Sequence, residues 1–182
     1  MIAIVLSRPK SCSPISWAIR KITNSDVSHA SIHFSHIGGP FSTGYRWVLE
    51  STGSGVNLVA AERWDNHNKL MYAFRIRDDV MGPKALYIIF RELGAEYDFA
   101  GIGRFCAYLV LEKVNKRLAR MCVPDTPDKM FCSEVVARYL HLLDGMLRND
   151  SFEPVKNLLP DLTSPEDLKM LRLCEGATPC AL

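Results

Sequence analysis

The chain has 182 residues, 48% of them hydrophobic, and its 22 Lys and Arg against 20 Asp and Glu leave a formal net charge of +2. A chain of this length buries roughly 70% of its unfolded surface, so one domain needs no disulfides. The near-balance of charge argues against a dedicated binder of nucleic acid or anionic membranes, since such proteins carry a basic excess. We find no repeat, low-complexity tract or linker, and expect a single domain over residues 1–182.

The first ten residues, MIAIVLSRPK, have no charged n-region and only a short apolar run, which indicates a strand at about residues 2–6. Without a secretory signal, we expect the six cysteines to be thiols in a reducing compartment. The expected location is cytoplasmic, with non-classical or phage-type delivery as the other route. No stretch reaches the roughly 20 apolar residues of a membrane-spanning helix, so no integral membrane segment is expected.

The next elements change from helical to strand period. Ser13 is expected to cap a short amphipathic helix that begins at Pro14. From residue 28 apolar and polar residues alternate in SHASIHF, which indicates a strand with one apolar face. Further strands are expected in YRWVLES, GVNLVAAERW and KLMYAFRIR, separated by turns at TGSG and DNHN. Together these segments predict an antiparallel sheet.

The rest of the chain is helical in pattern. We expect helices in GPKALYIIFRELG with Gly94 at its end, at about 101–120, at about 130–144 with Gly145 as its stop, and in TSPEDLKML with Ser164 as N-cap. Strands followed by helices are typical of the α+β class.

Cys132 opens FCSEVVARYL and is expected in the first turn of its helix, on the apolar face. The helix dipole and the unpaired N–H groups there lower the pKa of a thiol and create nucleophiles. The same N–H groups bind a developing oxyanion. Inert packing is the alternative, and it is roughly five times more common for a cysteine chosen blindly.

A cysteine nucleophile also needs a histidine base and a third group that orients the ring. His29 and His33 lie on one face of the expected strand, and periodicity does not choose between them; taken alone, each is more often a satisfied strand histidine. His67 in the DNHN turn and His141 on the polar side of its helix are interpreted as solvated. Glu50 ends WVLE and is a candidate third group, although most glutamates simply face water.

The order of several short segments resembles the order in circularly permuted papain-like cysteine peptidases and amidases of the NlpC type, in the lecithin-retinol acyltransferase-like superfamily. These segments are SHASIHF, WVLES, GVNLV, AEYDFAG, FCSEVVARYL and LTSPEDL. The resemblance covers nearly the whole chain. It implies an antiparallel sheet packed against a cysteine-bearing helix, with Cys132 as nucleophile, His29 as base and Glu50 as the orienting group. It also implies that Tyr97 lies at the wall of the site, with Ser133 as a second candidate to contact substrate or oxyanion.

The expected reaction is attack of the Cys132 thiolate on an amide carbonyl, through an acyl-enzyme intermediate and without metal or organic cofactor. Expected substrates are a peptide, a peptidoglycan fragment or an acylated molecule. Lipid acyltransferase relatives usually have an acid and a histidine after the cysteine, whereas Ser133 and Glu134 follow it here, which favours the peptidase-like branch. A thioesterase or acyltransferase using the same thiol, and a non-catalytic binding protein on the same fold, are the alternatives.

Other site classes have weaker support. HASIHFSH suggests zinc, but a strand points His29 and His33 one way and His36 the other, and CxxC and HExxH spacings are absent. A serine hydrolase lacks its GxSxG elbow, and GIGRF lacks the third glycine of a nucleotide-binding loop. Residues 105–128 form a long connection to the cysteine helix, interpreted as a specificity element or, more commonly, an amphipathic helix with a basic face.

Overall fold

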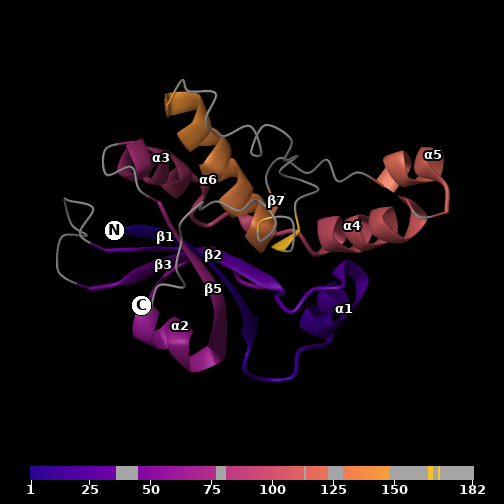
Figure 1. Cartoon of the computed structure of the whole chain (residues 1–182), viewed down its shortest axis with the longest axis horizontal. Coiled ribbons are helices and arrows are strands. Elements are labelled where there is room, and N and C mark those ends of the chain that lie inside the picture. The colour runs from indigo at the N-terminus through magenta and orange to yellow at the C-terminus, as the bar shows by residue number, and fades with distance from the viewer. Residues whose placement is uncertain are drawn as a thin grey trace.

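The fold is α+β, with a five-stranded antiparallel sheet and helices on both of its faces (Figure 1). The computed structural model describes residues 1–35, 45–76, 81–112, 114–122 and 129–147, together with Ser164, Pro165 and Leu168. The elements are β1 (Ile2–Pro9), α1 (Pro14–Thr23), β2 (His29–Phe34), β3 (Trp47–Thr52), β4 (Gly55–Ala60), α2 (Ala61–His67), β5 (Asn68–Ile76), α3 (Met81–Ile89), η2 (Phe90–Glu92), β6 (Glu96–Tyr97), α4 (Phe99–Glu112), α5 (Lys116–Ala119), η3 (Arg120–Cys122), β7 (Lys129–Met130) and α6 (Cys132–Leu147). The α+β class and the antiparallel sheet predicted from the sequence are confirmed.

Strand β2 lies in the middle of the sheet, whose order is β4-β3-β2-β1-β5. In the register of β2 with β3, Ser31 lies opposite Glu50. Opposed residues of antiparallel strands share a face, and side chains alternate along each strand. His29, Ser31, His33 and Glu50 therefore lie on one face, with His29 and Glu50 as diagonal neighbours at the start of β2.

Both faces of the sheet are covered. On one face Ile4, Leu6 and Ile32 belong to the main apolar core, which continues into α3 and α6. On the other face Val5 and Val48 pack with Ala61 and Trp64 of α2. Figure 1 shows α3 and α6 on one side of the strands and α2 on the other. The strand pattern predicts one apolar face for β2, but the packing of α2 buries its histidine face as well.

The segment GVNLVAAERW is strand only in its first part. Strand β4 ends at Ala60, and α2 continues through His67, so the expectations of a strand up to Trp64 and a turn at DNHN are wrong. Ala61 and Trp64 are i and i+3 on α2, and both are buried against the sheet. Burial of this pair overrides the strand-like local pattern, because helix or strand preference is a weak signal beside tertiary packing.

Helix boundaries in the second half also differ from expectation. The single helix expected at 101–120 is divided into α4 and α5. Asn115 lies before α5 and caps it, because its Oδ1 accepts from the backbone N–H groups of Arg117 at 3.0 Å and Leu118 at 3.3 Å. The expected stop at Gly145 is wrong, since α6 runs to Leu147. Across the described ranges, every helix falls short of the length and hydropathy that crossing a bilayer requires.

Candidate active site

Cys132 is the first residue of α6, as its sequence position predicts. The carbonyl of Phe131 accepts hydrogen bonds from the backbone N–H groups of Glu134 and Val135, at 3.1 and 3.3 Å. These bonds close the first helical turn, which contains Cys132. The sulfur accepts backbone N–H groups of Ala30 and Ser133. Cys132 is 4% exposed. Its sulfur thus sits in a cradle of backbone donors shared between the helix start and strand β2.

A hydrogen bond to Met130 fixes the helix start against the sheet. The buried hydroxyl of Ser51, next to Glu50 on β3, donates to the Met130 carbonyl at 2.6 Å. Met130 also pairs with Tyr97, because β6 and β7 form a short parallel ladder. Ser51 and Tyr97, which are far apart in the sequence, therefore both contact Met130, two residues before Cys132.

Strand β6 reaches this place through a close approach to β4. Gly55 has φ +94°, and a Cβ there would collide with the backbone carbonyl of Ala95. Val56 instead donates its N–H to that carbonyl at 2.9 Å, and Gly94 donates to the Val56 carbonyl at 2.9 Å. A glycine at position 55 is thus required for the position of Tyr97, because its backbone is left-handed and the space for a side chain is absent.

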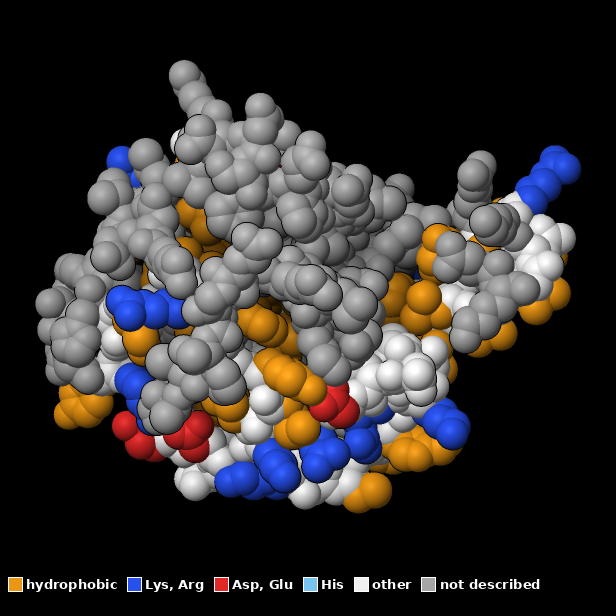
Figure 2. All heavy atoms as spheres, in the orientation of Figure 1, with side chains coloured by type: hydrophobic (Ala, Val, Ile, Leu, Met, Phe, Trp, Pro, Cys, Tyr) orange, Lys and Arg blue, Asp and Glu red, His pale blue; other side chains and the backbone are white. Residues whose placement is uncertain are grey.

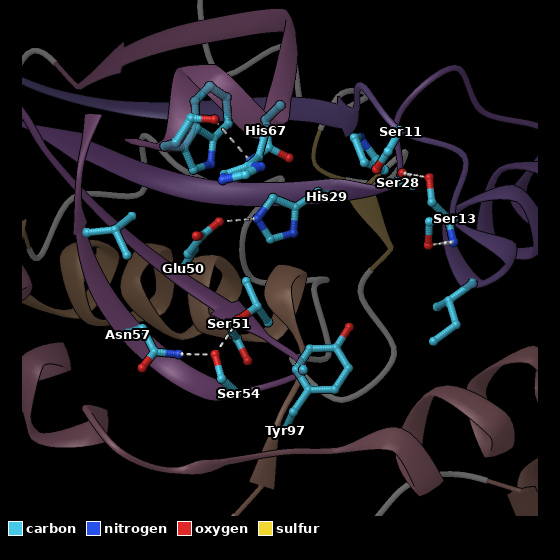
Figure 3. Close-up of a pocket in the computed structure, with 18 of the residues that line it drawn as sticks. Ser11, Ser13, Ser28, His29, Glu50, Ser51, Ser54, Asn57, His67 and Tyr97 are labelled. Atoms are coloured by element: carbon cyan, nitrogen blue, oxygen red, sulfur yellow. Dashed lines mark hydrogen bonds and ion pairs between the residues drawn. The ribbon is translucent and has the colours of Figure 1, made fainter. Parts of the chain in front are cut away.

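His29 is hydrogen-bonded on both sides. Its Nε2 lies 2.7 Å from Oε2 of Glu50, as Figure 3 shows, and the side chains are 13% and 10% exposed. A second hydrogen bond joins the ring to Cys132. Because Glu50 occupies Nε2, Nδ1 is the nitrogen left to face the sulfur. The three residues expected to form a triad are thus brought together in one chain of contacts.

The electrostatics of this chain favour charged forms of both His29 and Cys132. Burial opposes charge on His29, but hydrogen bonds and charges from Cys132 and Glu50 outweigh it and raise the His29 pKa to about 10. Burial likewise opposes a thiolate, but the hydrogen bond and charge of His29, aided by the N–H groups of Ala30 and Ser133, lower the Cys132 pKa below its ordinary value. These directions favour a thiolate–imidazolium pair near neutral pH.

His33 shares the strand face with His29 but has no acid beside it. Its Nε2 contacts Ser31 Oγ at 3.2 Å, and its ring meets Trp64 edge-on with centroids 4.5 Å apart. Burial, with the positive charges of Arg46 and His29, lowers the His33 pKa to about 3. His33 is therefore a neutral packing residue, and the structure separates two histidines that periodicity leaves equivalent.

A pocket of about 730 Å³ lies in front of the triad. Ser28, His29, Glu50 and Tyr97 line it, and Cys132 does not. The sulfur lies directly behind this wall, 4.0 Å from the Ser28 carbonyl oxygen and hydrogen-bonded to His29. The pocket therefore lies beside the sulfur, separated from it by the side chains of this wall.

Tyr97 is half-buried on β6 and lines the pocket, and Figure 3 shows its ring below the His29–Glu50 pair. Burial and the negative charges of Cys132 and Asp98 raise the Tyr97 pKa, so its hydroxyl stays protonated. Its ring is braced edge-on by Phe99 at a centroid distance of 4.8 Å. A protonated phenol near the sulfur is a hydrogen-bond donor available to a bound group.

The residues after the cysteine are buried. Ser133 is 1% exposed and contributes its backbone N–H to the sulfur; its side chain does not line the pocket. Glu134 pairs with Arg138 at 2.7 Å, one turn along α6. His67 is exposed, as expected, but it lies on α2 rather than in a turn and lines the pocket; His141 is half-buried.

Sequence reasoning missed Ser51 and Ala30. Ser51 follows Glu50 in WVLES, but nothing in a single sequence indicates its contact with Met130. Within the described ranges, no three His, Cys, Asp or Glu side chains cluster as metal ligands, and the four cysteines there are free thiols. His36 of the zinc alternative, Cys174 and Cys180 lie outside the described residues.

A scan against protein-family models found no matching family, and a search of curated proteins found no significant match. The chemistry of the site therefore follows from its contacts. A buried thiolate with an imidazolium on one side is a nucleophile with a proton donor beside it. An acid behind the imidazole fixes the orientation of the ring.

Proposed function

We propose that the chain is a cysteine-dependent hydrolase that cleaves an amide bond, peptide or isopeptide, on a permuted papain-like fold of the NlpC type. The observation that carries the proposal is the position of His29, bonded to Cys132 on one side and to Glu50 at 2.7 Å on the other. The strand with the histidine precedes the helix with the cysteine, and that helix packs against the antiparallel sheet. This arrangement supports the permuted fold.

The first half of the reaction is acylation. The Cys132 thiolate attacks the carbonyl carbon, a C–S bond forms, and the carbonyl electrons move onto oxygen. The protonated Tyr97 hydroxyl and the Ser133 N–H, which turns from the sulfur to the oxygen as the thiolate loses its charge, are candidates to stabilise that oxyanion. His29 then gives its proton to the leaving nitrogen as the C–N bond breaks, which leaves a thioester on Cys132 and releases the amine.

The second half is deacylation. Neutral His29 takes a proton from water, and the resulting hydroxide attacks the thioester carbonyl. The C–S bond breaks, the carboxylic acid leaves, and the thiolate–imidazolium pair is restored. Glu50 keeps its contact with Nε2 throughout, so that Nδ1 stays directed at the reacting atoms.

Access to the sulfur requires a small movement. Cys132 is 4% exposed and lies behind the wall formed by Ser28, His29 and Tyr97. A rotation of the cysteine side chain, or of one wall residue, brings the sulfur to the pocket surface. Such rotations are fast compared with typical enzyme turnover.

A catalytic role explains the charges better than a purely structural one. Burying an ion pair is weak evidence for stability, because desolvation offsets the attraction. Strongly shifted pKa values beside a pocket are concentrated at functional sites. The opposed pKa shifts of His29 and Cys132 are of this kind.

The test is turnover of peptide substrates, with peptidoglycan stem peptides first, followed by mass spectrometry of the products. Cys132→Ala is expected to lower turnover at least ~10³-fold while the fold is retained, because the nucleophile is lost. Cys12→Ala, which removes an exposed thiol, is the matched control and is expected to have no effect. Turnover retained in Cys132→Ala would reject the proposal. Parallel amide, ester and thioester substrates separate a hydrolase of amides from a thioesterase or acyltransferase.

A further inference from the structure

The pocket has a basic wall contributed by α2. Arg63 and His67 both line the pocket, and both are exposed. They are four residues apart on one helix, so their side chains lie on the same face, one turn from each other. Figure 3 shows His67 and Tyr97 on opposite sides of the His29–Glu50 pair. The basic wall and Tyr97 therefore border the reaction centre from different sides.

Nothing in the described part of the chain neutralises Arg63. It forms no ion pair or hydrogen bond with any described residue. The residues three and four positions away along the chain are Val59, Ala60, Asn66 and His67, none of which is acidic. The nearby acid Asp65 pairs instead with Arg46, at 3.3 Å. The guanidinium is thus available to a ligand.

The rest of the pocket lining does not supply the missing negative charge. Glu50 is its one acidic residue within the described ranges, and its carboxylate contacts His29 at 2.7 Å. Lys and Arg side chains gather along the lower edge of the molecule between α2 and α1, as Figure 2 shows. The pocket reaches the same region, because Pro9, Ser11 and α2 residues line it. Among the described lining residues, Arg63 is thus the one Lys or Arg side chain, and the single acid of the lining is already in contact with His29.

We propose that Arg63, assisted by His67, binds a carboxylate group of the substrate at the α2 end of the pocket. A guanidinium binds a carboxylate through two parallel N–H···O bonds, which fixes orientation as well as charge. The inference rests on the proposed function. It narrows the substrate class to amides whose acyl part carries a carboxylate group at a distance from the bond that is cleaved. Arg63 acts here in specificity and does not touch the reacting atoms.

The experiment uses two alkylating probes that differ only in charge. N-iodoacetyl-6-aminohexanoate carries a carboxylate, and its carboxamide analogue is neutral; both alkylate a thiolate with loss of iodide. Rates at Cys132 and at exposed Cys12 are measured in the same sample by peptide mass spectrometry. Wild-type protein is expected to react at Cys132 about tenfold faster with the anionic probe than with the neutral one, as one charged hydrogen-bonded contact allows. Shorter probes of the series report how far the basic wall lies from the sulfur.

Variants at Arg63 complete the test. Arg63→Gln is expected to remove most of the anionic preference and Arg63→Lys to retain much of it, while the rate with the neutral probe stays unchanged. Arg117→Gln, which removes an exposed arginine from α5, is the control for loss of net charge and is expected to leave the ratio as in wild type.

The outcomes separate the two proposals. An anionic preference that Arg63→Gln does not reduce overturns the carboxylate site and leaves the nucleophile intact. Failure of Cys132 to react faster than Cys12 with either probe overturns the proposed function, and the substrate site with it. Circular dichroism of each variant verifies that the fold is retained.

Discussion

The two histidines of β2, His29 and His33, have pKa values shifted in opposite directions. His29 and His33 lie four residues apart on one strand face, and both are largely buried. The pKa of His29 is raised to about 10 and that of His33 is lowered to about 3. Burial acts in the same direction on both, so the difference comes from their neighbours. Glu50 and Cys132 adjoin the first ring, whereas Trp64 and Ser31 adjoin the second.

The position along the strand decides which neighbours are present. His29 is the first residue of β2, where the start of α6 and the Glu50 carboxylate both reach it. His33 lies deeper, under Trp64 of α2.

The largest expected effect comes from removing the imidazolium. In His29→Gln, only the N–H groups of Ala30 and Ser133 still oppose the effect of burial on the thiol. The thiol is then expected to stay protonated at pH 6, and its alkylation by iodoacetamide at that pH to fall at least ~10²-fold. In His33→Gln the rate is expected to stay within about threefold of wild type, since only packing is changed. Rates are measured by peptide mass spectrometry. Equal losses in the two variants would contradict the separation of roles.

The next effect concerns stability and pH. The pKa of His33 is about 3 in the folded protein and 6.5 in the unfolded chain. Between pH 3 and pH 6.5 the His33 ring is therefore protonated in the unfolded chain and neutral in the folded protein. Stability from this group is therefore complete above pH 6.5 and decreases as the pH falls toward 3. Lowering the pH from 7 to 4.5 is expected to cost about 2–3 kcal/mol through this group.

Urea unfolding of wild type and His33→Gln at both pH values measures that difference. The variant is expected to lose less stability on acidification than wild type, by the amount given above. An equal loss in both proteins would mean that His33 takes up its proton in the folded state. NMR titration of the His33 ring gives the same answer without a variant.

The smallest effect is expected from Glu50→Gln, which keeps the size of the side chain and removes its charge. The hydrogen bond and charge of Glu50 contribute to the raised His29 pKa, so that pKa is expected to fall. Alkylation of Cys132 at pH 6 is expected to decrease about tenfold, and less at pH 8.5, where a thiolate forms without help. An unchanged pH profile in Glu50→Gln would show that the acid does not support the ion pair.

Much of the fold could be predicted from local pattern. The period of two in SHASIHF and the Ser13–Pro14 start of α1 are local signals, and both elements form where expected. The structure also brings Cys132, His29 and Glu50 together, as the resemblance implied, although their catalytic roles stay a prediction.

What local pattern could not predict depends on long-range packing. The choice of His29 over His33 depends on Trp64, whose helix was expected to be strand. The Ser51 anchor depends on a contact across 79 positions. Arg63 appears in a sequence only as one exposed cation among many, and its place in the pocket follows from the packing of α2.

The most direct test of the central claim is the pH dependence of Cys132 alkylation by neutral iodoacetamide between pH 5 and 9. A thiolate held by His29 predicts a rate that changes little from pH 6 to 8, with an apparent pKa well below that of an ordinary thiol at ~8.5. A rate that instead rises about tenfold for each pH unit from 5 to 8, as an unassisted thiol gives, would contradict the account.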